Sequence, residues 1–174
     1  MKKTFIAFVL LTVAVAAACS HQQHHGYDPG ESSKQVKSLT ETEVTGYLEG
    51  RGMGLAKPAE LNSYPGPMHV LELADKLSLT AEQRTETQRI FDAMRAEATR
   101  LGTLIVDKEG ELNRAFAEGS ITRESLASRV TEISRLQGEL RALHLGAHIE
   151  MKQVLSAEQV KTYDELRGYR KAGV

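Results

Sequence analysis

Two long runs of apolar residues at helical spacing constrain the fold of this chain more than any other feature. The first run extends from Ile90 to Phe116 and the second from Leu126 to Val154, with Gly119 between them. Apolar residues that recur every three or four positions lie on one face of an α-helix, with charged residues on the opposite face. The pattern therefore predicts two long amphipathic helices that fold back on each other as an extended antiparallel hairpin.

The composition favours an all-α fold class and argues against several functions. The 174 residues include no Trp and only four Phe, so the core would be built from Leu, Ala, Val, Ile and Met. The formal net charge of −1, without a basic stripe, gives no reason to expect nucleic-acid binding. The sequence has no nucleophile elbow, phosphate loop, HExxH or paired-cysteine motif, so we expect no enzymatic activity and no required cofactor.

A five-residue phrase occurs twice, as LTAEQ at positions 79–83 and as LSAEQ at positions 155–159. The interval is too long for a solenoid repeat, so each copy is expected to act locally. In each copy the Thr or Ser suits a helix N-cap, and the Gln three positions later completes a capping box worth about 1 kcal/mol. The phrase therefore predicts two helix starts. The residues of this capping motif are Leu79, Thr80, Gln83, Leu155, Ser156 and Gln159.

Two short helices are expected outside the hairpin, over residues 67–77 and 157–169, which gives a short-long-long-short order. Pro67 suits the first position of a helix. Ile121 and Leu126 offer a hydrophobic staple at the start of the second long helix, but no capping box is expected there.

One glycine lies inside each half of the predicted hairpin. Gly102 and Gly138 are equally distant from Ser120 along the chain, so an antiparallel hairpin brings them to the same level. Because glycine inside a helix costs about 0.5–1 kcal/mol relative to alanine, the pair suggests a close crossing or a shared bend. The alternative is two tolerated glycines.

The N-terminal residues predict export. Lys2 and Lys3 precede an uncharged apolar run that is short for a membrane span, so residues 1–18 are expected to be a signal peptide. Cys19, the only cysteine, follows directly and resembles the acylated cysteine of a bacterial lipobox. Acylation would anchor the protein to a membrane on the periplasmic side, and Ser20 favours the outer membrane. The alternative is ordinary cleavage that leaves a free thiol.

Residues 19–64 show no sustained apolar period. Their polar residues, glycines and prolines would bury too little apolar surface to offset the loss of chain entropy. We therefore expect a flexible tether with at most a helical turn near KPAEL, followed by a helical domain over residues 65–170.

The repeated phrase, the leader and the helix order make the chain resemble the LTXXQ-motif family, which includes the Spy and CpxP periplasmic chaperones, zinc-resistance-associated proteins and heavy-metal sensors. The resemblance covers about residues 65–170, and AELNSYPGPMHVLELADKLSLTAEQ is similar to the heavy-metal-resistance branch. It implies a hairpin bent into a thin cradle, usually a dimer, with an apolar and basic concave face. Members hold unfolded envelope proteins without ATP, or bind metal and report to a signalling partner.

The first function that the resemblance implies is an ATP-independent, lipid-anchored chaperone of the envelope stress response. A hairpin one helix thick cannot bury both faces, so part of the apolar stripe would stay exposed and bind unfolded or misfolded envelope proteins. The alternatives are that the stripe packs on the two short helices, that a homodimer buries all of it, or that the protein is a spacer lipoprotein without clients. The candidate client-binding residues are Met94, Leu101, Ile105, Leu136 and Leu140.

The second function is a periplasmic heavy-metal sensor or resistance protein with a membrane sensor protein as its partner. His144 and His148 are one helical turn apart, and Met151 continues their face. Such ligands can hold zinc, copper, nickel or cobalt, with His69 and a carboxylate from Glu97 as further candidates. The alternative for the two α-helical histidines is a packing or solvated role. A loosely held ion in the tether would use His21, His24 and His25.

Overall fold

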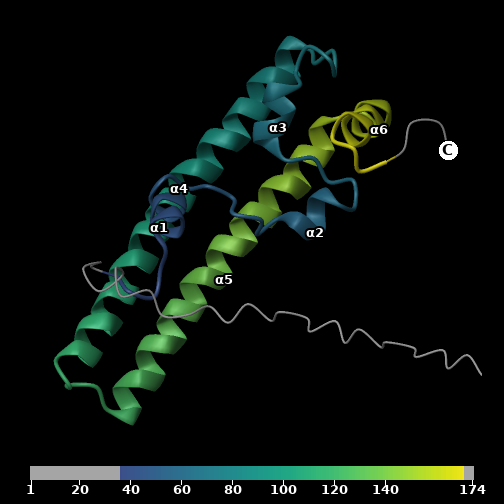
Figure 1. Cartoon of the computed structure of the whole chain (residues 1–174). Coiled ribbons are helices and arrows are strands. Elements are labelled where there is room, and N and C mark those ends of the chain that lie inside the picture. Colours follow the sequence, from purple (N-terminus) through teal and green to yellow (C-terminus); the bar gives the residue numbers. More distant parts are fainter. Residues whose placement is uncertain (1–35, 171–174) are drawn as a thin grey trace, which may run out of the picture.

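The structure, a computed structural model, describes residues 36–170 and consists there of six helices without a β-strand (Figure 1). The helices are α1 (Glu41–Leu48), α2 (Lys57–Glu60), α3 (Pro67–Glu72), α4 (Ala81–Ala117), α5 (Arg123–Val154) and α6 (Ala157–Leu166). The all-α prediction is confirmed. The predicted signal peptide, Cys19 and the three tether histidines lie outside the described residues. None of the helices between residues 36 and 170 combines the length and apolar character that a membrane span requires.

α4 and α5 form the predicted hairpin and pack side by side (Figure 1). The turn between them contains Gly119 at φ 65°, a left-handed conformation that glycine adopts without strain. Thr122 caps α5, and here one prediction is wrong, because Ser125 completes a capping box. The Ser125 hydroxyl accepts a hydrogen bond from the Thr122 backbone N–H at 3.0 Å, the role that Glu or Gln usually takes.

The first copy of the repeated phrase begins α4, and the second copy begins α6. Thr80 accepts a hydrogen bond from the Gln83 backbone N–H at 3.1 Å, and Ser156 accepts the equivalent bond from Gln159 at 3.2 Å. The leucine before each cap is buried in one cluster with residues of α3 and α6. The two short helices end earlier than predicted, because the chain turns through residues 73–78 after α3 and through the residues that follow α6.

The prediction of a flexible tether is wrong for residues 36–64. α1 follows the N-cap Thr40, forms a capping box with Glu43 and packs on α4 (Figure 1), while the turn expected near KPAEL is α2. Tyr47 and Leu55 pack on the apolar cluster between the long helices. Contact with the hairpin therefore stabilises a segment whose own composition predicts little structure.

Gly102 allows α1 to approach α4. A Cβ atom on Gly102 would collide with the backbone carbonyl of Tyr47, so a larger residue would push the two helices apart. An added Cβ on Gly138 meets no atom within 4 Å. Gly102 therefore serves the packing of α1 on α4, and Gly138 is a tolerated glycine that no neighbouring atom requires.

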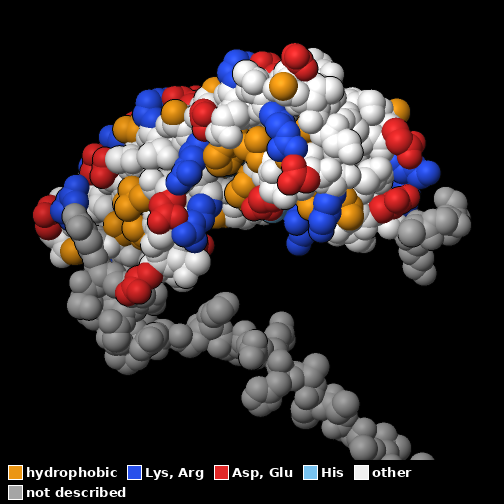
Figure 2. Space-filling view, turned by 90° about the horizontal axis from the view of Figure 1, so that it is seen from above, with side chains coloured by type: hydrophobic (Ala, Val, Ile, Leu, Met, Phe, Trp, Pro, Cys, Tyr) orange, Lys and Arg blue, Asp and Glu red, His pale blue; other side chains and the backbone are white. Residues whose placement is uncertain are grey.

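The covering segment changes the expected surface of the hairpin. All five residues predicted to bind clients are buried, with exposed fractions from 0% to 9%. Four of them pack together in the cluster under α1, and Met94 packs with Ile90 and Ala147. Figure 2 shows small apolar patches between charged side chains on the bowed molecule. The expectation of an exposed apolar stripe is contradicted for these residues, because the chain's own N-terminal segment covers much of the stripe.

Candidate metal site

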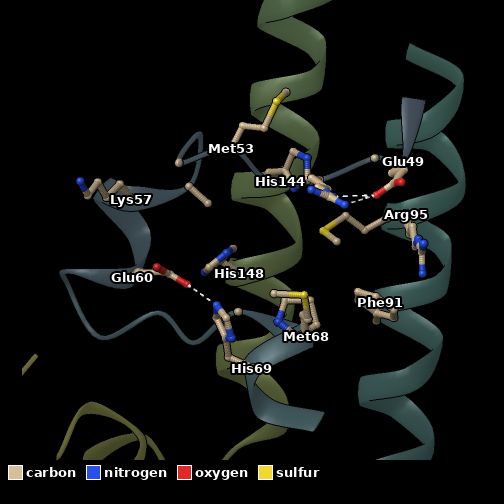
Figure 3. Close-up of a pocket in the computed structure, with 18 residues that line it drawn as sticks. Glu49, Met53, Lys57, Glu60, Met68, His69, Phe91, Arg95, His144 and His148 are labelled. Carbon is tan, nitrogen blue, oxygen red and sulfur yellow. Dashed lines mark hydrogen bonds and ion pairs between the residues drawn. The ribbon is translucent and has the colours of Figure 1, made fainter. Parts of the chain in front are cut away.

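A pocket of about 540 Å³ lies between the long helices and the segment that joins α1 to α3 (Figure 3). α5 contributes His144 and His148, α4 contributes Met94, and α3 contributes His69. His69, His144 and His148 are all the histidines among residues 36–170, the part of the chain that the structure describes. The fold therefore brings the imidazole of His69 together with two imidazoles of α5 that are far from it along the sequence.

A tight loop after α1 closes the pocket over His144. Gly50, Met53 and Gly54 have positive φ values of 65°, 42° and 78°. This path carries the loop across the His144 ring, where a Cβ atom on Gly52 would lie 3.9 Å from both Cε1 and Nδ1. A non-glycine residue in the left-handed region is uncommon, and such strain is often found at binding sites.

His144 is held in the interior of the structure without a hydrogen bond at one ring nitrogen. Its exposed fraction is 3%, and Nε2 has no partner. Burial lowers the pKa of His144, and the neighbouring His148 lowers it further. The ring is therefore neutral at pH 7, which is the form that binds metal ions.

His148 is oriented by the backbone of the segment that faces it. Its Nδ1 lies 2.8 Å from the carbonyl oxygen of Tyr64. Because a carbonyl can only accept, Nδ1 carries the proton and Nε2 carries the free lone pair. A Cβ atom on Gly66 would lie 2.9 Å from Cε1 and 3.1 Å from Nε2 of His148, so glycine leaves room for the ring edge that carries this lone pair.

His69 lies across the pocket, between two carboxylates. Its Nδ1 is 2.7 Å from Oε2 of Glu72, and its Nε2 is 3.8 Å from Oε1 of Glu60. Figure 3 shows His69 and Glu60 on the side of the pocket that faces His148.

Thioethers line the same pocket. Met94 is 9% exposed and Met68 is 45% exposed. Met53 also borders the pocket, but its sulfur lies against Gly46 of α1. Methionine sulfur is a soft ligand that favours copper among the metals considered.

Two residues predicted as ligands do not line this pocket. Met151 has an exposed fraction of 0% and packs with Val70 and Tyr163 in the cluster between α3, α5 and α6. Glu97 lies on the outer side of α4, where Arg100 donates two hydrogen bonds to it at 2.6 Å and 2.8 Å. Helical spacing predicts that Met151 and Glu97 lie near the histidines of the hairpin. However, Met151 packs into the core, and the ion pair with Arg100 holds Glu97 on the outer side of α4.

The donor atoms fit a transition-metal ion only in part as they stand. Within residues 36–170, no three His, Cys, Asp or Glu side chains are grouped closely enough to hold an ion. However, the buried Nε2 of His144 lacks the partner that buried polar atoms normally have. In addition, a backbone carbonyl orients His148 through its other nitrogen, as is usual for histidines that bind metal. His144 and His148 are therefore the pocket residues that could hold a metal ion.

Sequence analysis missed Glu60 and the thioethers of Met68 and Met94 as lining residues. Glu60 belongs to α2, inside the segment expected to be a tether, and no local pattern indicates that it faces His69. The only available signal was the predicted helical turn near KPAEL, which ends in Glu60 and Leu61.

Comparison with known proteins agrees with the helix order and the repeated phrase. A family model described as heavy-metal resistance matches residues 51–161. No curated protein matches the chain, and neither does any solved structure. The match begins in the loop over His144, includes all three pocket histidines and ends in α6. Since it covers well over half of the 174 residues, the chain belongs to the heavy-metal resistance family.

Proposed function

We propose that this protein binds a transition-metal ion in the pocket of His69, His144 and His148, and that this binding serves heavy-metal resistance or sensing. The observation that carries the proposal is the convergence of all three described histidines on one pocket. Family membership supports it, because the family is described by resistance to heavy metals.

The chemistry of the pocket favours a borderline or soft cation. Neutral imidazoles suit zinc, copper, nickel and cobalt, and the nearby thioethers of Met68 and Met94 add affinity for copper. His144 and His148 would hold the ion from α5, and His69 faces them from α3. The protein contributes the buried imidazole of His144, whose pKa burial lowers, and a His148 ring whose Nδ1 is fixed by the Tyr64 carbonyl.

The setting of this activity is also a proposal. The leader-like residues 1–18 and the following Cys19 support export and a lipid anchor at the outer membrane. Replacement of Cys19 by Ser should release the protein from the membrane fraction, and mass spectrometry of the wild-type N-terminus should find an acylated cysteine. An unmodified thiol in a soluble wild-type protein would contradict the anchor.

The chaperone function stays a prediction, as does the homodimer. The five apolar residues predicted to bind clients are buried in this conformation, so they offer no surface to an unfolded protein. We therefore place metal binding first.

Calorimetric titration of the full chain with Zn²⁺, Ni²⁺ and Cu²⁺ tests the proposal. Replacement of both His144 and His148 by Gln, which keeps polar side chains at the two sites, should weaken binding at least about tenfold. The control replaces His21, His24 and His25 by Ala and should leave the tight site unchanged. Equal affinity in wild type and the His144/His148 variant, with both proteins folded by circular dichroism, would contradict the proposal.

A further inference from the structure

We propose that Glu60 is the carboxylate ligand of the ion site and that Tyr169, after α6, is the residue that positions it. This inference rests on the proposed metal binding and adds a ligand and a positioning residue to it. Tyr169 lies beyond residues 51–161, which the family model matches, whereas Glu60 lies within them.

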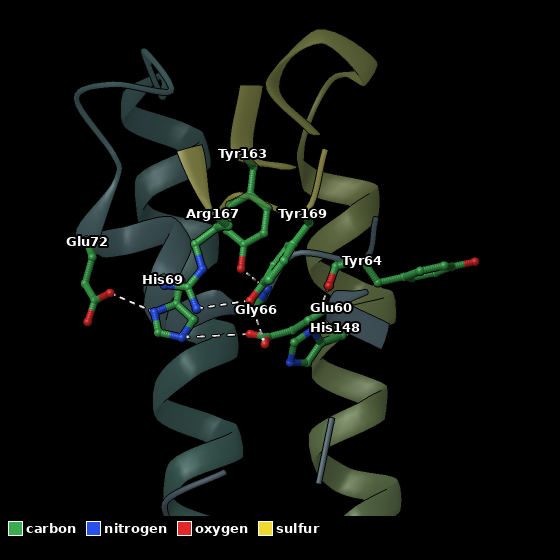
Figure 4. Close-up of polar contacts among 9 residues, drawn as sticks. All are labelled: Glu60, Tyr64, Gly66, His69, Glu72, His148, Tyr163, Arg167 and Tyr169. Carbon is green, nitrogen blue, oxygen red and sulfur yellow. Dashed lines mark hydrogen bonds and ion pairs between the residues drawn. The ribbon is translucent and has the colours of Figure 1, made fainter. Parts of the chain in front are cut away.

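Glu60 lies close to His69 of α3 and to the backbone that faces His148 of α5. Its Oε1 is 3.8 Å from Nε2 of His69. A Cβ atom added to Gly66 would lie 3.4 Å from Oε1 of Glu60 and 3.1 Å from Nε2 of His148. Oε1 of Glu60 and Nε2 of His148 therefore lie beside the backbone of Gly66, and Nε2 of His69 approaches the same carboxylate oxygen (Figure 4).

The separation of Glu60 and His69 is close to that of two ligands on one ion. Two ligands that bind zinc at 2.0–2.2 Å with a tetrahedral angle stand about 3.4 Å apart. Oε1 of Glu60 and Nε2 of His69 exceed this spacing only slightly at 3.8 Å. The three groups are not yet arranged around one point, so an ion that also binds Nε2 of His148 would require side-chain rotations.

The other carboxylates near the pocket have different partners. Glu97 is bound by Arg100, and Glu49, which lines the pocket, is bound by Arg51 at 2.7 Å. Glu72 contacts His69, but at Nδ1, which leaves Nε2 to the pocket. Glu60 is therefore the carboxylate with an oxygen directed toward the Nε2 atoms of two histidines.

Tyr169 fixes the other oxygen of Glu60. The Tyr169 hydroxyl donates to Oε2 at 3.0 Å and accepts a hydrogen bond from Arg167 at 3.1 Å. Because the Arg167 guanidinium can only donate, it directs the hydroxyl proton of Tyr169 toward Glu60. The carboxylate is thus held through Oε2, while Oε1 stays available to the ion.

The ring of Tyr169 is itself held by the core beneath α6. Its centroid is 6.4 Å from that of Tyr163, which is fully buried and accepts a hydrogen bond from the Gly66 backbone N–H at 3.3 Å. Figure 4 shows Tyr163, Tyr169 and Arg167 gathered beside Glu60 and Gly66. The turn after α6 therefore supports both Glu60 and the backbone beside His148.

Titration of the full chain with Co²⁺, followed by its visible absorption, tests the inference. Glu60→Gln should weaken Co²⁺ binding at least about tenfold and change the absorption bands, because an oxygen ligand is lost. Tyr169→Phe should weaken binding about tenfold by freeing the carboxylate. In a Glu60→Gln background, Tyr169→Phe should have no further effect, since there is no carboxylate left to position.

Two matched variants control for charge and for the loss of a tyrosine hydroxyl. Glu97→Gln removes a carboxylate that Arg100 binds outside the pocket, and Tyr47→Phe removes the hydroxyl of a tyrosine that packs on the cluster between the long helices. Both should keep Co²⁺ affinity within about twofold of wild type, well below the effect expected of a supporting contact. Thermal unfolding of each variant without metal shows whether the fold is intact.

The outcomes separate this inference from the proposed function. If His148→Gln abolishes binding while Glu60→Gln and Tyr169→Phe bind like wild type, Glu60 is not a ligand and the inference is overturned alone. If Tyr169→Phe weakens binding equally with and without Glu60, Tyr169 does not act through the carboxylate, and its role is overturned. If wild type does not bind Co²⁺ or the other metals, both proposals fail together.

Discussion

Gln83 and Gln159 exchange two hydrogen bonds, in which each side-chain amide donates to the oxygen of the other at 2.9 Å. Each oxygen also accepts the backbone N–H of its own N-cap, at 3.1 Å for Thr80 and 2.9 Å for Ser156. The repeated phrase thus does more than begin two helices. It joins the start of α4 to the start of α6 through two equivalent capping boxes.

The first prediction concerns this glutamine pair. Gln83→Ala or Gln159→Ala should each lower the free energy of unfolding by about 1–3 kcal/mol, because the partner amide is left without its bond in a half-buried site. The double variant should lose less than the two single losses together. Urea unfolding measures all three, with Gln88→Ala on the exposed face of α4 as a control that should change stability by about 0.5 kcal/mol or less. Strict additivity would contradict the paired arrangement.

The second prediction uses the two glycines inside the long helices. Gly138→Ala should stabilise the protein by about 0.5–1 kcal/mol, since nothing obstructs the added Cβ and alanine favours the helix. Gly102→Ala gains the same preference but collides with Tyr47, so it should destabilise the protein by about 1–3 kcal/mol. Displacement of α1 should also speed trypsin cleavage at the exposed Arg51, because the loop after α1 would lose its hold on α4. Equal stabilisation by both substitutions would show that α1 does not pack on Gly102.

The third prediction concerns stability at high pH. Burial raises the pKa of Tyr163 to about 12, from a value of 10.0 in the unfolded chain. The unfolded state therefore loses this proton first, and stability falls as the pH rises from about 10 to about 12. Over this pH range, the unfolding free energy of the wild type should fall by about 2 kcal/mol more than that of Tyr163→Phe. Parallel pH dependence of the two proteins in denaturant unfolding would contradict burial of the phenol.

The long hairpin was predictable because its apolar spacing repeats over many turns, which makes the helical period clear. The repeated phrase predicted the starts of α4 and α6 because capping is local chemistry. α1 was missed although Thr40 and Glu43 have the spacing of a capping box, since the polar residues of that region show no sustained apolar period. Only tertiary contact with α4 shows why this short helix forms.

For the candidate site, sequence analysis identified the histidines but not their neighbours. The spacing of His144 and His148 follows from one helix, so it was visible in the sequence. The approach of Glu60 to His69 depends on where α2 packs, and Tyr169 reaches Glu60 only because α6 folds back beside it. Contacts between separate elements have no local sequence signal, which is why Glu97 was chosen in place of Glu60.

The most direct test of metal binding by the α5 histidines is nuclear magnetic resonance of the full chain labelled with ¹⁵N at the histidine rings, recorded before and after addition of Zn²⁺. One equivalent of Zn²⁺ should shift the ¹⁵N resonances of Nε2 in His148 and of one ring nitrogen in His144. Nδ1 of His148 should stay protonated, because it donates a hydrogen bond to the Tyr64 carbonyl. Unchanged resonances of His144 and His148, with shifts confined to His21, His24 and His25, would contradict the metal site.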